Sequence, residues 1–185
     1  MIDASRILGT EVGSTAPSFL AILAVHVPAG LTAVITGAGA ALTRKGSARH
    51  IRLGRWYYRA ITVVFVSAAV LAVLRWRQDW DLLLLGTLAY TGAVIGFLHR
   101  RRRRPGNAGH ILGMGGSYAV MLTAFFVDNG PHLPLWDHLP TWAFWLLPSL
   151  IAAPVIARSL LRARGQTLHE KQAATAPRPV SPPST

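Results

Sequence analysis

Five long stretches of this chain contain no Asp, Glu, Lys or Arg. A charge at the centre of a lipid bilayer costs roughly 2.5–3.5 kcal/mol, so uncharged apolar runs of this kind are typical of membrane-spanning helices. Because a span needs about 20 residues, we expect the shorter runs to extend into their flanks. The predicted spans are Pro17–Thr43, Ala60–Leu74, Leu82–Leu98, Ile111–Val127 and Ala143–Ala157.

These runs predict an all-α fold, a polytopic transmembrane helical bundle with a four-helix core and a fifth transmembrane helix. The chain divides into an external N-terminal arm (1–16), a five-span domain (17–164) and a disordered cytoplasmic tail (165–185). The tail is polar and rich in proline, a composition typical of disorder. The sequence has no cysteine, which excludes disulfides and thiol redox chemistry.

The basic residues occupy alternate connections between the spans. Sixteen of the 19 Lys and Arg residues lie in 44–59, 100–104 and 158–178, all on one side of a five-span chain. The other side has three, together with six of the seven acidic residues. By the positive-inside rule, this bias predicts a bacterial inner-membrane protein with its N-terminus outside and its C-terminus in the cytoplasm.

A run of five arginines follows the third predicted span. We expect it to anchor the turn against anionic lipid headgroups, each charge contributing on the order of 1 kcal/mol. The formal charge of +12 could also suggest a nucleic-acid binder. No base-stacking or groove-reading module accompanies it, so nucleic acid is not a predicted partner. The anchoring residues are Arg100, Arg101, Arg102, Arg103 and Arg104.

Several histidines share helical rows with small residues and so should face the interior of the bundle. Neutral imidazole is a good ligand of haem iron, and the predicted axial ligands are His50, His99 and His110 at the cytoplasmic rim. His26 lies roughly 25 Å away along the helix axis, at about 1.5 Å per residue. It therefore belongs to a separate outer site, which would also need His132.

The sequence offers no catalytic residue. The cytoplasmic half has no carboxylate before Glu170, and Ser117 has no His–Asp relay, which argues against a zinc enzyme, an ion-coupled transporter and a nucleophilic enzyme. The leading hypothesis is a small b-type haem protein that transfers electrons. The alternative is a non-enzymatic structural or assembly partner that binds other membrane proteins or a second copy of itself. We interpret the outer loop 128–142 as an interfacial turn held by tryptophans, with a lid or docking surface as alternatives.

A weak internal repeat links the two basic connections. "HIRLGRWYY" begins at His50 and "HILGMGGSY" at His110, sixty residues later, and each places a tyrosine eight residues on (Tyr58 and Tyr118). The repeat predicts two tandem helical hairpins that form the four-helix core. The two histidines would then occupy equivalent positions at the cytoplasmic rim.

The same segments resemble a known family. "KGSARHIRLGRWYY" and "HILGMGGSYAVMLTAFFVDNGPHLP" are similar to two signatures of the domain of unknown function 2306 family. The resemblance implies a bacterial multi-pass membrane protein and brings no established activity. The family's histidine layout is similar to that of small di-haem membrane cytochromes, an analogy that favours haem. The matching positions are His50, Gly54, Tyr58, His110, Met114, Ser117 and Tyr118.

Overall fold

The computed structural model describes residues 6–7, 10–11, 17–74, 76–102, 106–134 and 138–175. The predicted all-α fold is confirmed. The five long helices are α1 (Pro17–Leu42), α2 (Ala48–Leu74), α3 (Trp76–Arg101), α4 (Ala108–Asn129) and α5 (Thr141–Thr175), with a short 3₁₀ helix η1 (Gly130–His132) after α4. Near the N-terminus the two-residue strands β1 (Arg6–Ile7) and β2 (Thr10–Glu11) pair antiparallel.

Five helices of the described chain are long and apolar enough to cross a membrane, which supports the predicted multi-pass membrane protein. The spans are Pro17–Leu42, Ala48–Val73, Trp80–Arg101, Ala108–His132 and Thr141–Gly165. The second span starts twelve residues earlier than predicted. Arginine is a good helix former, and its long apolar stem lets a charged head reach the membrane surface from within a span.

The predicted start of the disordered tail at residue 165 is wrong, because α5 continues to Thr175. Residues 166–175 are mostly Gln, Leu, Glu, Lys and Ala, which favour helix, and the first proline of the tail stands at 177. The prediction of disorder for 176–185 lies outside the described residues.

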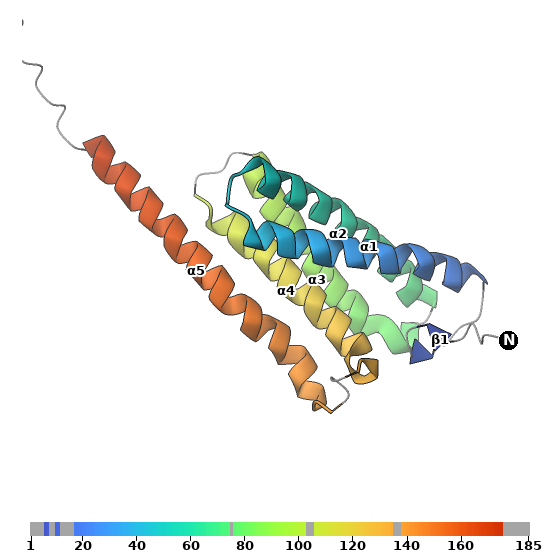
Figure 1. Cartoon of the computed structure of the whole chain (residues 1–185). Coiled ribbons are helices and arrows are strands. Elements are labelled where there is room, and N and C mark those ends of the chain that lie inside the picture. The colour runs from blue at the N-terminus through green and yellow to red at the C-terminus, as the bar shows by residue number, and fades with distance from the viewer. Residues whose placement is uncertain are drawn as a thin grey trace, which may run out of the picture.

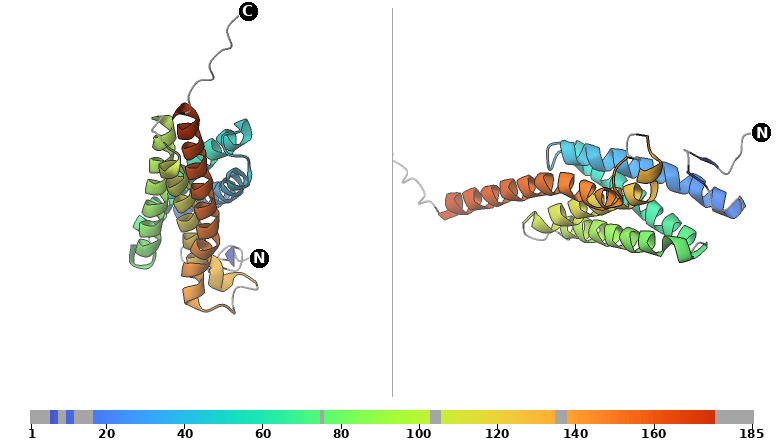
Figure 2. Two further views of the ribbon diagram at one scale, coloured as in Figure 1. Left: turned by 90° about the vertical axis from the view of Figure 1, so that its left-hand side faces the viewer. Right: turned by 90° about the horizontal axis from the view of Figure 1, so that it is seen from below.

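Helices α1 to α4 run alternately up and down and form the four-helix core (Figures 1 and 2). Each helix packs against the next in the chain, and contacts between α1 and α4 close the bundle. Helix α5 packs on α4 and projects past the core at its C-terminal end (Figure 1). Small and aromatic residues dominate the buried core: Ala33, Tyr57, Ala60, Ile61, Ala89, Ala93 and Met121.

Three glycines, Gly92, Gly96 and Gly113, bring α3 and α4 into backbone contact. A Cβ atom at Gly113 would lie 2.6 Å from the backbone nitrogen of Gly96 and 2.7 Å from the carbonyl oxygen of Gly92. Membrane helices without a hydrophobic driving force between them rely on such small-residue seams.

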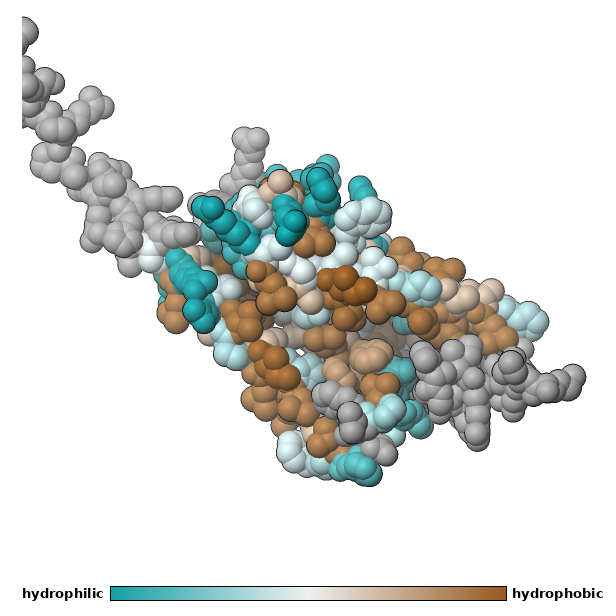
Figure 3. Space-filling model, viewed as in Figure 1, coloured by the Kyte–Doolittle hydropathy of each residue, from teal (hydrophilic) through white to brown (hydrophobic). Residues whose placement is uncertain are grey.

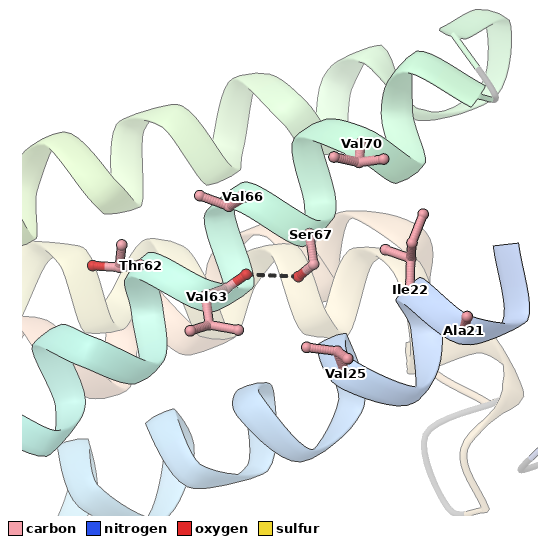
Figure 4. Close-up of a pocket in the computed structure, with 8 residues that line it drawn as sticks. All are labelled: Ala21, Ile22, Val25, Thr62, Val63, Val66, Ser67 and Val70. Carbon is pink, nitrogen blue, oxygen red and sulfur yellow. Dashed lines mark hydrogen bonds between the residues drawn. The ribbon is translucent and has the colours of Figure 1, made fainter. Parts of the chain in front are cut away.

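The pair α1 and α2 is packed less closely. An apolar hollow of about 470 Å³ lies between their halves nearer the N-terminal end of α1 (Figure 4). Its walls are Ala21, Ile22, Val25, Thr62, Val63, Val66, Ser67 and Val70. Large apolar side chains are also exposed along the helices, including Leu31, Ile35 and Leu84, as a surface facing lipid requires. Figure 3 shows apolar residues over much of the visible face and hydrophilic ones gathered where α2 begins.

Candidate functional site: paired histidines at the basic end

The basic end is the end of the bundle where α1 and α3 finish and α2 and α4 begin. Both connections there contain a glycine in the left-handed conformation, Gly46 with φ 81° and Gly106 with φ 77°. Each glycine lies four residues before a histidine, in the shared pattern Gly-x-Ala-x-His. Because glycine adopts positive φ without steric cost, the same reversal of the chain introduces α2 and α4. The turn therefore delivers His50 and His110 to matching positions.

Both histidine rings are held by a main-chain carbonyl of the preceding helix, which is α1 for His50 and α3 for His110. The Nδ1–H of His50 donates to the carbonyl oxygen of Ala40 at 3.0 Å, and the Nδ1–H of His110 donates to that of Gly96 at 2.9 Å. A carbonyl oxygen can only accept, so in the neutral ring the proton is on Nδ1 and the lone pair on Nε2. Both imidazoles are thus fixed in the same tautomer.

The two rings face one another across the diagonal of the bundle. Their centres are 6.2 Å apart and their planes make an angle of 80°. Among the described residues, the Nε2 atoms of this pair make no hydrogen bond, and neither atom is fully enclosed. Each ring therefore keeps an Nε2 lone pair that no described residue engages.

The geometry beneath the pair agrees with two hairpins related by a spacing of 60 residues. Tyr57 and Ser117 are 60 residues apart, as the histidines are, and they share a buried hydrogen bond of 2.7 Å. The Tyr118 hydroxyl crosses to the other hairpin and donates to the carbonyl oxygen of Val34 at 3.1 Å. Sequence reasoning missed the Tyr57–Ser117 pair, although the 60-residue spacing could have pointed to it.

His99, the third predicted ligand, does not join the pair. Its Nε2–H donates to the carbonyl oxygen of Gly106 at 3.0 Å. Its ring lies directly against Gly109, where a Cβ atom would have no room. Arg100 supports the same connection by donating to the Asn107 side chain at 2.8 Å. His99 therefore fixes the turn before α4, which is the turn that places His110.

The remaining predicted residues lie elsewhere. His26 is in the other half of the bundle, where its Nδ1–H donates to the Ser67 hydroxyl at 2.8 Å, while Ser67 donates to the carbonyl oxygen of Val63. His132 is exposed in η1. Of the predicted headgroup anchors, Arg100, Arg101 and Arg102 are exposed at the basic end, and Arg103 and Arg104 lie outside the described residues.

One further cation borders the site. Lys45, in the turn between α1 and α2, donates from Nζ to the carbonyl oxygen of Ala41 at 3.0 Å and so caps the end of α1. Partial burial lowers the pKa of its ammonium group. The surroundings of the histidine pair are thus positively charged on both connections.

The donor set limits the metal chemistry available to this site. Within the described part of the chain, no three His, Asp or Glu side chains are grouped closely enough to hold one metal ion. Two imidazoles alone do not complete the four protein ligands of a structural zinc site. They do suffice for haem, whose macrocycle supplies the other four nitrogens.

Comparisons with known proteins add no identification. No family model matches the chain, and no curated protein or solved structure matches it. The resemblance to the domain of unknown function 2306 family therefore stays a prediction.

Proposed function

We propose that this integral membrane protein binds haem b between His50 and His110 and serves in electron transfer. The observation that carries the proposal is the 6.2 Å separation of the two ring centres. At that separation the two imidazoles would be able to hold one haem iron between them, and the macrocycle would supply the remaining nitrogen ligands.

The hydrogen bonds of the pair support the same role. Haem ligands and other metal-binding histidines usually donate their second ring N–H to a carbonyl or carboxylate, which fixes the ring and makes the ligating nitrogen more basic. His50 and His110 each have this bond to a main-chain carbonyl. His99 uses its Nε2 in the turn, so the proposed ligand set is reduced from three histidines to two.

Open space next to the pair is a further support. Gly54 lies one helical turn from His50 on the same face of α2, and a Cβ atom there would meet no atom within 4 Å. A flat macrocycle needs such a gap beside its ligand. When bound, the haem would supply one-electron chemistry, while His50 and His110 would hold the group.

We also infer the orientation predicted from the sequence, with the basic end on the cytoplasmic side of a bacterial inner membrane and the N-terminus outside. The support is the concentration of Lys and Arg in the connections 43–47 and 102–107 and at the C-terminal end. A reporter enzyme that is active only in the cytoplasm should therefore be active when it is fused after Arg102.

The test of haem binding is the visible spectrum of the full chain, expressed with haem available and purified in detergent. The wild type should show a Soret band. His50→Ala and His110→Ala should each abolish or strongly shift it, because each removes one axial ligand. His26→Ala and His132→Ala are the matched controls and should retain the band, because both histidines lie away from the basic end.

A folded wild-type protein without a Soret band would overturn the proposal. A band that survives both His50→Ala and His110→Ala would do the same. The first result favours the alternative, a structural or assembly partner of other membrane proteins, whereas the second would mean that other residues hold the haem. Helical content by circular dichroism separates these outcomes from a failure of the variants to fold.

A further inference from the structure

A second site lies on the outer surface of α2, on the same half of the bundle as the histidine pair. Three arginines and a tryptophan at helical spacing line a surface hollow of about 220 Å³: Arg52, Arg55, Trp56 and Arg59. All four side chains are exposed. Their positions, three and four residues apart, place them on one face of the helix.

The position of Arg59 along α2 places its charge deep in the membrane. Arg59 lies eleven residues into α2, or about 16 Å from its start, on a surface that faces lipid. The headgroup layer on each side of a bilayer is only about 5–8 Å thick. The Arg59 side chain turns back towards the basic end, with its guanidinium carbon 5.5 Å from the centre of the Trp56 ring. This cation–π contact directs its charge towards the headgroups.

The guanidinium groups have no anionic partner among the side chains that the structure describes. Among the described residues, none of Arg52, Arg55 and Arg59 forms an ion pair with an acidic side chain. Unpaired cations on a lipid-facing surface are costly, so their partner is expected from the membrane. Guanidinium forks match the oxygens of a phosphate group.

The internal repeat identifies the face of α4 that corresponds to this face of α2. The position in α4 equivalent to Arg55 is Gly115, sixty residues later, and Gly115 packs against Ile156 of α5. The first hairpin has no corresponding helix in the described chain. Where α4 offers a glycine to a helix, α2 presents charge and an indole, which suit a polar headgroup and not an apolar helix.

We propose that the face of α2 formed by Arg52, Arg55, Trp56 and Arg59 binds the headgroup of an anionic phospholipid. The guanidinium groups hold the phosphate, and the Trp56 indole lies beside the glycerol region, where tryptophan is favoured. This site is separate from the predicted anchor Arg100–Arg104, and it combines a hollow with the contact between Arg59 and Trp56. It does not depend on haem binding.

The test counts bound lipid by native mass spectrometry on the full chain in detergent, with equal amounts of phosphatidylglycerol and phosphatidylcholine as probes. The wild type should retain phosphatidylglycerol selectively. Arg55→Gln/Arg59→Gln should lower that retention on the order of tenfold, because two contributing charges are lost. The control Arg158→Gln/Arg162→Gln removes the same charge from exposed positions of α5 outside the hollow and should change retention less than about twofold.

A conservative variant keeps the test independent of folding. Arg55→Lys/Arg59→Lys preserves the charge but not the paired donors, and it should bind phosphatidylglycerol at an intermediate level. Equal losses in the test and control pairs would overturn the proposal, since they would indicate attraction by net charge alone. Displacement of the lipid by millimolar inorganic phosphate would also overturn it, because it would identify a site for a small anion.

Discussion

In the hairpin α3–α4, glycines bring the two helix backbones into contact, whereas in α1–α2 larger side chains keep the helices apart. Gly113 lies against Gly96 in the second hairpin. At Gly39 in the first hairpin, the nearest neighbour of an added Cβ is the Leu53 side chain, 3.1 Å away. The apolar hollow between α1 and α2 belongs to this looser packing (Figure 4).

Both hairpins nevertheless hold their histidine in the same way. The bonds from His50 to Ala40 and from His110 to Gly96 differ by only 0.1 Å in length. The position of the rings is therefore set by the glycine turn and the carbonyl acceptor, both of which are local, and not by how closely the helices pack. Four sets of substitutions test this separation of roles.

A substitution in the glycine contact between α3 and α4 should destabilise the protein most. Gly113→Ala should destabilise the protein by about 2 kcal/mol, because the new methyl group meets backbone that cannot move without separating α3 from α4. Gly116→Ala, on the same helix, meets no atom within 4 Å and should be neutral. Thermal unfolding in detergent, followed by circular dichroism, measures the difference. Equal stabilities would show that the seam is not under packing constraint.

The hydrogen bond that joins the hairpins should have the next largest effect. Tyr57→Phe should cost about 1 kcal/mol, because the buried Ser117 hydroxyl loses its partner. Ser117→Ala should cost a similar amount, and the double variant less than the sum of the two. Thermal unfolding of the two single variants and the double variant in detergent gives the coupling free energy between the two hydroxyl groups. Strict additivity would mean that the two hydroxyls do not stabilise each other.

The two left-handed turns should respond alike. Gly46→Ala and Gly106→Ala should each cost about 1 kcal/mol, because alanine is strained at positive φ. Asparagine, which tolerates this conformation, should recover part of the loss at both positions. If only one turn proves sensitive in the same unfolding assay, the equivalence of the two hairpins does not extend to their connections.

Substitutions in the wall of the hollow between α1 and α2 should have the smallest effect on stability. Ala21→Leu adds bulk to its wall and should change stability by less than about 0.5 kcal/mol, as surface substitutions do. A loss comparable to that of Gly113→Ala would show that α1 and α2 are as constrained as α3 and α4.

The architecture of the bundle was predictable because uncharged apolar runs of 15 residues or more have few alternatives to a membrane span. The tandem hairpins were also predicted, from the spacing of His50 and His110. The ends of the helices were not, because arginines at 49, 52, 55 and 59 interrupt the apolar pattern without interrupting the helix. The same limitation applies to α5, whose polar extension to Thr175 has helix-forming residues but no apolar signal.

The candidate site was predicted only in part. Sequence placed three histidines at one depth but could not separate His99 from the other two, because that distinction depends on which carbonyl each ring reaches. The glycines at 46 and 106 were visible in the shared Gly-x-Ala-x-His pattern. Their left-handed conformation and its effect on both histidines required coordinates.

The hydrogen bonds that fix each imidazole lie within one hairpin, whereas the contact between the imidazoles lies between hairpins. Each hairpin therefore positions its own histidine, and the pair of rings forms only after the two hairpins dock. Any molecule that bridges the two rings gains binding energy from the docked state alone, and by mass action it must stabilise that state. Binding of such a molecule and docking of the two hairpins are thus thermodynamically linked. The linkage is measurable either as binding affinity or as stability of the bundle.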